Sequence, residues 1–413
     1  MSSSDYASLM KEYGCPLYLY EEKILATQLE LLRSTFPNFS LLYSMKTNPH
    51  PAICRFMATN GVGVDAASPF EVTHALQAGV APQNILYSAP GKTVADLTKA
   101  LEKCIITADS YNELSRLEAL AAEYHLKEPL PVGIRINPDM AFSSGEFPEI
   151  TGGISAKFSV DEESLPKNKP LFSSLRHIRP AGIHVFLRSQ VLSHTSLAKS
   201  FGAVFTVAMR CRELFGWDIS FINFGGGLGI APSVNAPGLD TEKLRESVQQ
   251  LVETYLPSLP GCTLYIESGR FLVGQAGSFI TRIEDIKESR GKTYVIAPGC
   301  LNAFLRPAVS GLLTGLPFSV QGPFEPLFSS GEAHAVALPE KREGVSRQVT
   351  VCGNLCTALD TVARDIMLPD PQIGDILTIS NAGAYAATLS PSNFASFPPP
   401  KEVYMQENGA IRE

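Results

Sequence analysis

Leu41-Leu42-Tyr43-Ser44-Met45-Lys46-Thr47-Asn48-Pro49 is an apolar run that ends on one lysine. Its start is typical of a buried strand. The C-terminal end of a parallel strand is where barrel enzymes carry their reactive groups, and an amine that loses its charge there can act as a nucleophile. Most lysines are solvated surface residues, so the rest of the chain must decide between the two interpretations.

Short apolar runs recur along the chain with the spacing of strands. We count eight, at 41–44, 62–65, 85–88, 104–107, 132–136, 182–186, 221–224 and 263–267. Segments with helical periodicity alternate with them, for example 69–78, 111–124, 196–214 and 241–256. This alternation predicts an α/β protein with a TIM-like (β/α)8 barrel, with a doubly wound open sheet as the alternative.

The barrel hypothesis requires reactive residues at the C-terminal ends of the strands. Five candidates lie at or just beyond such ends: Lys46, Asp65, Arg135, Phe186 and Glu267. The polar, glycine-rich segment 139–169 is typical of a long loop, which we expect over the mouth of the barrel.

A second domain is predicted after about residue 272, where short alternating strands separated by Pro and Gly turns replace the earlier rhythm. These strands are expected at 279–286, 293–297, 347–352 and 375–380. An early strand at 15–21 has no place among the eight and is expected to join them. The predicted domains are therefore a barrel at 36–272 and a β domain formed by 1–35 with 273–413, and only the two ends of the chain are expected to lack order.

Composition excludes several classes of function. The 413 residues carry a formal net charge of −7 and no cluster of Lys and Arg, so we expect a small-molecule substrate and no nucleic acid. The N-terminus has no secretion signal and no apolar run is long enough for a membrane span, so we expect a cytoplasmic protein that binds no membrane. The eight cysteines include no CxxC pair, and no metal site is predicted.

Two motifs near the predicted strand ends combine glycines with charge. In Asn223-Phe224-Gly225-Gly226-Gly227-Leu228-Gly229, the glycines expose N–H groups that can bind a phosphate, or they form a tight turn. In Glu267-Ser268-Gly269-Arg270, the arginine can pair with the glutamate or with a phosphate. The residues alone leave both choices open.

Taken together, six motifs resemble the fold-type III pyridoxal-phosphate decarboxylases, a family that includes ornithine, arginine and diaminopimelate decarboxylases. The motifs are Tyr43-Ser44-Met45-Lys46, Val64-Asp65-Ala66-Ala67-Ser68, Gly225-Gly226-Gly227, Glu267-Ser268-Gly269-Arg270, Gly353-Asn354-Leu355-Cys356-Thr357-Ala358-Leu359-Asp360 and Asn381-Ala382-Gly383-Ala384-Tyr385. They span residues 43 to 385 in the family's order. The resemblance implies an alanine racemase-like fold, a barrel followed by a C-terminal β domain.

The resemblance also implies roles for individual residues. Lys46 matches the lysine that bonds covalently to pyridoxal 5'-phosphate, and Glu267 matches the carboxylate that keeps the pyridine nitrogen protonated. Cys356 matches the cysteine that one subunit of a homodimer supplies to its partner's site, where its thiol gives up a proton. These three are the predicted catalytic residues.

Binding residues follow from the same motifs. The predicted cofactor-binding residues are Lys46, Asp65, Arg135, Phe186, Ser189, Gly226, Gly227, Glu267, Gly269, Arg270 and Tyr385. The predicted substrate-binding residues are Arg188, Arg306, Thr357 and Asp360.

The chain departs from the family's pattern at three positions. Phe186 and Arg188 replace a cofactor-stacking histidine and a glycine in a segment like H-x-H-x-G-S; the phenylalanine can still stack, while Arg188 points either to solvent or to an anion. Thr357 replaces the acidic residue that holds a distal ammonium. At Thr357 and in its ending at 394–404, the chain resembles the subgroup that acts on conjugated amino acids, such as citryl-diaminopropionate in siderophore biosynthesis or carrier-linked glutamate.

The sequence therefore predicts a homodimeric pyridoxal-phosphate-dependent amino-acid decarboxylase whose substrate has an acidic or conjugated distal group. A diaminopimelate-, ornithine- or lysine-type decarboxylase is an alternative. So is a regulatory homologue without catalysis, which the replacements at 186 and 188 make conceivable. An alanine racemase is disfavoured because that family places an arginine at the pyridine nitrogen, and a cofactor carrier is disfavoured by the partner-donated thiol.

Overall fold

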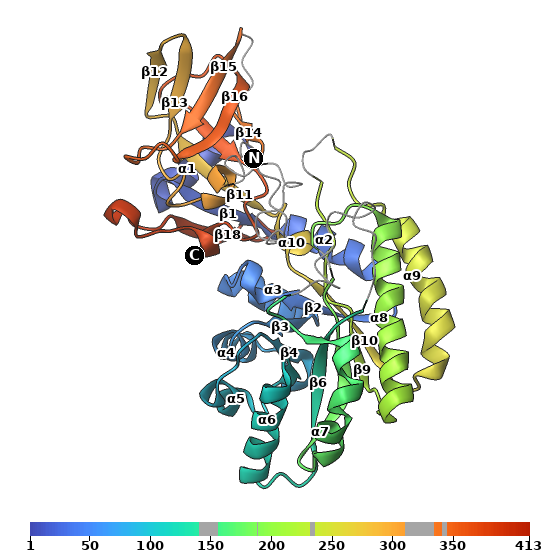
Figure 1. The fold of residues 1–413 in the computed structure, drawn as a ribbon. Helices are drawn as coiled ribbons and strands as arrows, with labels where there is room; N and C mark the ends of the chain where they lie inside the picture. Colours follow the sequence, from blue (N-terminus) through green and yellow to red (C-terminus); the bar gives the residue numbers. More distant parts are fainter. Residues whose placement is uncertain (140–155, 188, 232–235, 310–333, 341–344) are drawn as a thin grey trace. The chain divides into compact units, whose positions relative to one another are not determined.

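The computed structural model describes residues 1–139, 156–187, 189–231, 236–309, 334–340 and 345–413 (Figure 1). The chain divides into two compact units, which are described separately. The barrel unit comprises Glu30–Gly229 and Leu239–Gly269, and the β unit comprises Met1–Leu29, Ile230–Gly238 and Arg270–Glu413. That the β domain contributes to a dimer and to the active site stays a prediction.

Eight parallel strands form a closed barrel in the barrel unit (Figure 1). They are β2 (Phe39–Ser44), β3 (Gly63–Ala66), β4 (Ile85–Ser88), β5 (Ile105–Ala108), β6 (Leu130–Asn137), β8 (Ile178–His184), β9 (Phe221–Asn223) and β10 (Thr263–Ser268). β10 pairs with β2, and β5 pairs with β6, which closes the ring. The predicted barrel is confirmed, and the open doubly wound sheet is wrong because its edge strands would stay unpaired. A short strand, β7 (Val160–Asp161), adds to β6.

Helices follow most of the barrel strands, as the sequence predicts. They are α3 (Pro51–Thr59), α4 (Pro69–Gln77), α5 (Val94–Ala100), α6 (Tyr111–Glu123), α7 (Lys169–Ser174), α8 (His194–Phe215) and α9 (Thr241–Tyr255), while α2 (Glu22–Thr35) precedes β2. The N-cap residues Ser68, Thr93, Ser110, Ser193 and Asp240 each accept a backbone N–H from the first turn. Such caps satisfy donors that the helix leaves unpaired and fix where each helix begins.

A phenylalanine and two glycines fill one side of the barrel interior. Gly133 of β6, Gly182 of β8 and Phe221 of β9 lie side by side in register. A methyl group at Gly182 would overlap the ring of Phe221, and one at Gly133 would lie 3.0 Å from that ring. The ring therefore occupies space that two absent side chains leave. Phe221 also packs with other buried residues of the layer, Leu42, Leu86 and Tyr265.

Among its described residues, the β unit holds two sheets. Its helices include α1 (Ser3–Tyr13) and α10 (Arg270–Val273), and its strands are β1 (Leu17–Glu21), β11 (Gly277–Arg282), β12 (Asp285–Ser289), β13 (Lys292–Ile296), β14 (Val336–Ala337), β15 (Ser346–Cys352), β16 (Thr361–Pro369), β17 (Ile376–Ile379), β18 (Lys401–Met405) and β19 (Ile411–Arg412). One sheet has the order β14-β17-β11-β1-β18-β19, and the other β12-β13-β15-β16. The early strand joins this unit, as predicted, because β1 pairs with β11 and β18.

Two expectations about this unit are wrong. The run 279–286 is not one strand: the chain leaves β11 at Ile283, whose N–H bonds to Asp375, and enters β12 of the other sheet. The N-terminus is ordered rather than loose, because Ser2 and Asp5 form a capping box that begins α1. Leu9 and Met10 then pack into an apolar cluster with residues of β1, β11, β17 and β18.

Gly182→Ala tests the barrel interior. The added methyl group must displace the Phe221 ring, so we expect the free energy of unfolding to fall by about 1–3 kcal/mol. The matched control is Gly202→Ala in α8, where the nearest atom is 3.6 Å away. Helix propensity should make that variant more stable by roughly 0.5–1 kcal/mol. Urea unfolding measures both, and a Gly182→Ala protein as stable as the wild type would contradict the packing.

Candidate active site

Lys46 lies immediately beyond β2, in the short 3-10 helix Met45–Thr47. Its Nζ is 3.2 Å from Oδ2 of Asp65, which belongs to the neighbouring strand β3. Asp65 is buried, whereas 43% of the Lys46 side chain is exposed. The amine is therefore held at the barrel mouth by a carboxylate and still accessible to a ligand.

Glu267 is a buried carboxylate on β10, at the same end of the barrel. Its Oε1 accepts a hydrogen bond of 2.7 Å from Nδ2 of Asn223. Burial raises the pKa of Glu267 to about 7, and the charge of Asp65 raises it further, while Lys46 and the Asn223 bond oppose the change. A carboxyl group poised near neutral pH can be ionised by a cationic ligand that binds beside it.

His184 occupies the same interior as Glu267 but does not neutralise it. Its Nδ1 is 3.0 Å from the hydroxyl of Ser88, and its Nε2 is 3.2 Å from Oε1 of Glu267, out of line for a hydrogen bond. Burial and the positive charges of Arg135 and Lys46 hold the pKa of His184 well below its usual value. A neutral imidazole thus packs against Glu267 without adding a positive charge.

Arg135 projects from β6 between an acid and an aromatic ring. Its guanidinium is 3.5 Å from Oδ1 of Asp109 and lies 4.8 Å from the ring centre of Phe158. Behind it, Lys92 and Glu113 form an ion pair of 2.5 Å with both side chains buried. Burying these charges is tolerated because opposite charges adjoin one another.

The glycine loop after β9 follows the backbone of Glu267 closely. Gly225 and Gly227 have φ angles of +62° and +107°, which favour glycine. A methyl group at Gly226 would lie 2.8 Å from the carbonyl oxygen of Glu267, and one at Gly225 would lie 2.8 Å from the ring of Phe186. Absent side chains are therefore required here, and the turn leaves backbone open to a ligand.

The neighbouring predicted residues are placed as follows. Phe186, half-buried, comes just after β8 and packs on Gly225, and Ser189 is also half-buried. Gly269 faces Thr47, next to Lys46, so closely that a methyl group would overlap Thr47. Arg188 lies outside the described residues.

Two buried arginines adjoin Tyr385 in the β unit. The guanidinium of Arg270 lies 5.2 Å from the ring centre of Tyr385, and Arg306 donates a hydrogen bond of 3.1 Å to the carbonyl of Ala384. Burial lowers the pKa of Arg270 to about 10 and that of Arg306 to about 9, where Arg270 adds repulsion. Both remain charged at neutral pH, and two like charges buried together favour an anionic ligand.

Cys356 is exposed on a loop of the β unit that Asp360 shapes. The two carboxylate oxygens of Asp360 accept the N–H groups of Leu301 (2.6 Å) and Leu355 (2.7 Å). The carboxylate also fills the space beside Gly353. Asp360 therefore holds the loop that presents Cys356 and Thr357, while its predicted contact with substrate stays a prediction.

Each unit brings part of the predicted site together. The strand-end group of the barrel unit contains Lys46, Asp65, Arg135, Phe186, Gly226, Gly227 and Glu267, and the β unit contains Arg270, Arg306 and Tyr385 together and Cys356, Thr357 and Asp360 on one loop. Sequence reasoning missed Asn223, His184, Ser88 and Asp109. All four lie at or just beyond barrel strand ends, so the rule that singled out Asp65 would also have found them.

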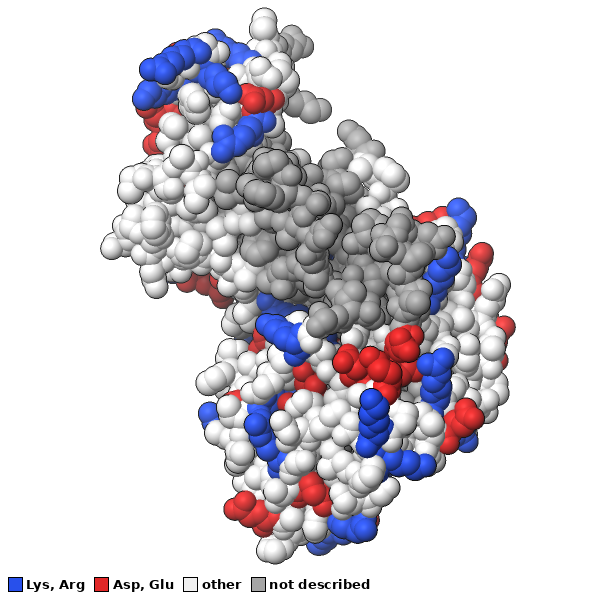
Figure 2. All heavy atoms as spheres, in the orientation of Figure 1, with Lys and Arg blue, Asp and Glu red and all other residues white. Residues whose placement is uncertain are grey.

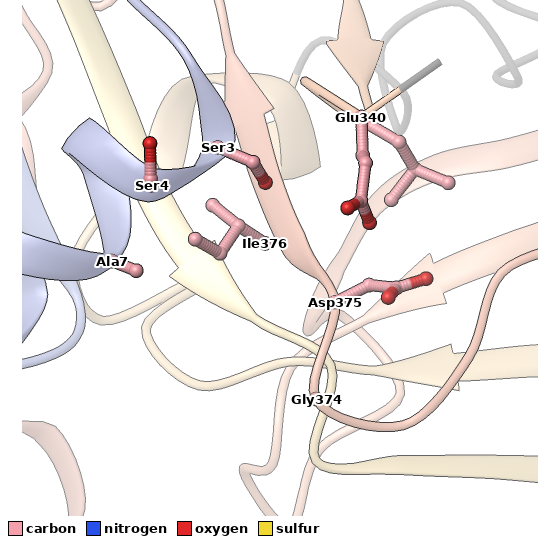
Figure 3. Close-up of a pocket in the computed structure, with 8 residues that line it drawn as sticks. Ser3, Ser4, Ala7, Glu340, Gly374, Asp375 and Ile376 are labelled. Atoms are coloured by element: carbon pink, nitrogen blue, oxygen red, sulfur yellow. The ribbon is translucent and has the colours of Figure 1, made fainter. Parts of the chain in front are cut away.

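Other features of the described residues do not compete with this site. A hollow of about 360 Å³ in the β unit is lined by Ser3, Ser4, Ala7, Leu338, Glu340, Gly374, Asp375 and Ile376, none of them a predicted site residue (Figure 3). Figure 2 shows acidic and basic side chains interspersed on the visible face of the barrel unit. Among the described residues, no His, Cys, Asp or Glu group could hold a metal. None of the described helices is both long and apolar enough to cross a bilayer.

Residues 22–274 match the family described as pyridoxal-dependent decarboxylase, pyridoxal binding domain. The chain belongs to this family of pyridoxal-phosphate-dependent decarboxylases, and it is an enzyme of that class. It is 32% identical to diaminopimelate decarboxylase of Methanothermobacter thermautotrophicus over 98% of this chain and 90% of the relative. It is 30% identical to L-glutamyl-(BtrI acyl-carrier protein) decarboxylase of Niallia circulans over 99% and 93%.

Solved structures share the fold. The crystal structure of diaminopimelate decarboxylase from M. jannaschii with L-lysine has a TM-score of 0.86, covering 98% of this chain and 90% of that one at 24% identity. The alanine racemase-like fold predicted from the sequence is thus confirmed. The family match confirms pyridoxal phosphate as the cofactor. When bound, this cofactor draws off the electrons that remain when carbon dioxide leaves an amino acid. The accessible Lys46 amine, the buried Glu267 carboxyl and the open glycine backbone fit such a group.

Glu267 should make the cofactor-free protein less stable as the pH rises. The folded state keeps the proton up to about pH 7, whereas the ordinary pKa is 4.5. Between these values the folded state binds more protons, so the free energy of unfolding falls with increasing pH. Glu267→Gln removes this titration and should reduce the fall between pH 5 and 8 by roughly 1–3 kcal/mol. Urea unfolding of the apoprotein measures it.

The matched control is Glu242→Gln on the exposed surface of α9, which should leave the pH dependence unchanged. Equal slopes for the wild type and Glu267→Gln would show that the buried carboxyl does not titrate in this range.

Proposed function

We propose that three residues of the strand-end group, Lys46, Asp65 and Glu267, carry out the decarboxylation. The observation that supports this most directly is an accessible amine paired with Asp65 at 3.2 Å, at the same barrel end as a buried carboxyl group. Lys46 bonds to the cofactor, and Asp65 orients its amine. Glu267 faces the pyridine nitrogen and keeps a proton there.

The phosphate of the cofactor is proposed to bind the glycine loop, where Gly226 and Gly227 offer backbone N–H groups. Arg270 and Tyr385 of the β unit could supply charge and a hydroxyl to a phosphate, and their part in cofactor binding stays a prediction. Phe186 provides an apolar face for the ring and holds no proton. Ser189 and Gly269 complete this part of the proposed site.

Diaminopimelate is the first substrate to test. The similarity to diaminopimelate decarboxylases extends over nearly the whole chain, and it favours this alternative over the siderophore-type substrate expected from short motifs. Arg306, buried beside Arg270, is the residue proposed to meet a substrate carboxylate. The distal carboxylate of diaminopimelate is a group that ornithine and lysine lack.

A second candidate is a conjugated or carrier-linked amino acid, which Thr357 favours. A threonine offers a hydroxyl where a distal ammonium needs a carboxylate, and a lost charge-assisted hydrogen bond costs roughly 1.5–3 kcal/mol. The similarity to the glutamyl carrier-protein decarboxylase supports the same choice. A regulatory homologue without catalysis is opposed by the presence of Lys46, Glu267 and Cys356 together.

Carbon dioxide release decides between the substrates. We expect the purified enzyme to act on diaminopimelate or on conjugated glutamate in preference to ornithine and lysine, and Lys46→Ala to abolish both the reaction and the absorption band of lysine-bound cofactor. Thr357→Glu should improve kcat/KM for a substrate with a distal ammonium by about 10- to 100-fold. Thr357→Gln, similar in shape but uncharged, is the control. Efficient use of lysine by the wild type would contradict the assignment of Thr357.

Cys356 is proposed to act in the active site of a partner subunit of a homodimer. If it does, mixing inactive Lys46→Ala with inactive Cys356→Ala subunits should restore about one quarter of full activity, because random pairing leaves one intact site in each heterodimer. Mixing Lys46→Ala with Glu267→Gln, both on the barrel unit, is the control and should restore the same fraction only if one of these residues also crosses between subunits. No recovery with Cys356→Ala after demonstrated subunit exchange would place the site within one chain.

A further inference from the structure

We propose that Asn223 is a positioning residue that holds the carboxylate of Glu267 and the glycine loop in one fixed geometry, so that one amide sets both ends of the cofactor site. The inference rests on the proposed function, since it takes Glu267 to face the pyridine ring and Gly225–Gly227 to face the phosphate. It concerns how this chain fixes the distance between those two groups.

The amide of Asn223 closes a small ring of hydrogen bonds. Its Nδ2 donates to Oε1 of Glu267 at 2.7 Å, and its Oδ1 accepts the N–H of Gly225 at 2.9 Å. The backbone N–H of Glu267 in turn donates to the carbonyl of Gly225 at 2.8 Å. Carboxylate, loop and amide therefore constrain one another, and a displacement of any one of them breaks at least one bond.

The orientation of this amide follows from its partners. A backbone N–H can only donate, so the oxygen of Asn223 must face Gly225 and the nitrogen must face Glu267. Asn223 is fully buried, and its backbone is paired on both sides, to His184 of β8 and Tyr265 of β10. The amide is therefore anchored to the barrel wall and cannot follow a moving loop.

Steric contact reinforces the link between loop and carboxylate. A methyl group at Gly226 would lie 2.8 Å from the carbonyl oxygen of Glu267, so the loop lies directly against the residue that carries the carboxylate. Within the described residues, the contacts of the Glu267 carboxylate with Asn223 and His184 are both made by Oε1. Oε2 is left to meet a ligand.

An amide suits this task because it donates and accepts at once without changing charge. Asn223→Asp keeps an oxygen for Gly225 but replaces the donor with a second carboxylate, which repels Glu267 above about pH 7, where Glu267 is ionised. Asn223→Ala removes both bonds. The two variants therefore separate the carboxylate half of the role from the loop half.

Affinities for pyridoxal phosphate and for pyridoxal, which lacks the phosphate, test the proposal on each purified apoprotein. We expect Asn223→Asp to weaken the binding of both ligands by about 10- to 100-fold. The ratio of the affinity for pyridoxal phosphate to that for pyridoxal, which is the advantage of the phosphate, should stay the same. Asn223→Ala should weaken both and also reduce that advantage about tenfold. Ser220→Ala is the control: it removes a 3.0 Å bond to Ala181 just before β9, at the opposite end of the barrel, and should change neither affinity.

A reversed pair tests the geometry without any cofactor. In the double variant Asn223→Asp with Glu267→Gln, the amide and the acid exchange places, so the hydrogen bond re-forms with donor and acceptor reversed. We expect Asn223→Asp alone to lower the unfolding temperature of the apoprotein and the double variant to recover most of the loss, which gives a favourable coupling in a double-mutant cycle.

Two affinity results would overturn the proposal: wild-type affinities in Asn223→Asp, or an unchanged preference for pyridoxal phosphate over pyridoxal in Asn223→Ala. An additive double-mutant cycle would equally show that the two side chains do not constrain each other, and it decides the matter if Asn223→Ala does not fold. Failure of the proposed function is distinct, because wild-type protein would then bind pyridoxal phosphate without bonding to Lys46.

Discussion

The closed register of the eight-stranded sheet is the constraint on which the site depends. Because every strand is parallel and β5 pairs with β6, all eight C-terminal ends meet at one mouth. The β5–β6 pairing brings together Asp109 and Arg135, while Lys46, Asp65 and Glu267 follow adjacent strands of the same ring. An open sheet would bring together only the ends of adjacent strands.

Within that mouth the electrostatics are dominated by burial. Glu267 is ringed by a neutral imidazole and an amide rather than by a cation, so its proton is held to about pH 7. Lys46 and Arg135 oppose this change without cancelling it. A cationic ligand that bound beside Glu267 would favour loss of this proton, so that binding and ionisation would be coupled.

Periodicity alone predicted the barrel, because each strand is short, apolar and followed by a helix or turn signal. It failed where a run of alternating residues crossed from one sheet to another, as at Ile283, since hydrophobic pattern does not record a change of partner. The strand-end rule found Lys46, Asp65 and Glu267, and it would have found Asn223 and His184. The contacts of 225–227 with Glu267 and Phe186, which explain why side chains are absent there, are contained in no local pattern, and ligand binding by this loop stays a prediction.

The place of β1 has a consequence for the order in which the chain folds. This strand precedes every barrel strand in the sequence, yet its partners β11 and β18 come from the last third of the sequence. During synthesis the barrel unit can complete all its strand pairings before the partner strands of β1 have been made. A ribosome-bound chain that stops short of Lys401 would therefore carry a finished barrel and an unpaired β1 edge, and such edges attract other strands. Synthesis through β18, rather than closure of the barrel, is therefore the step that pairs this edge of β1.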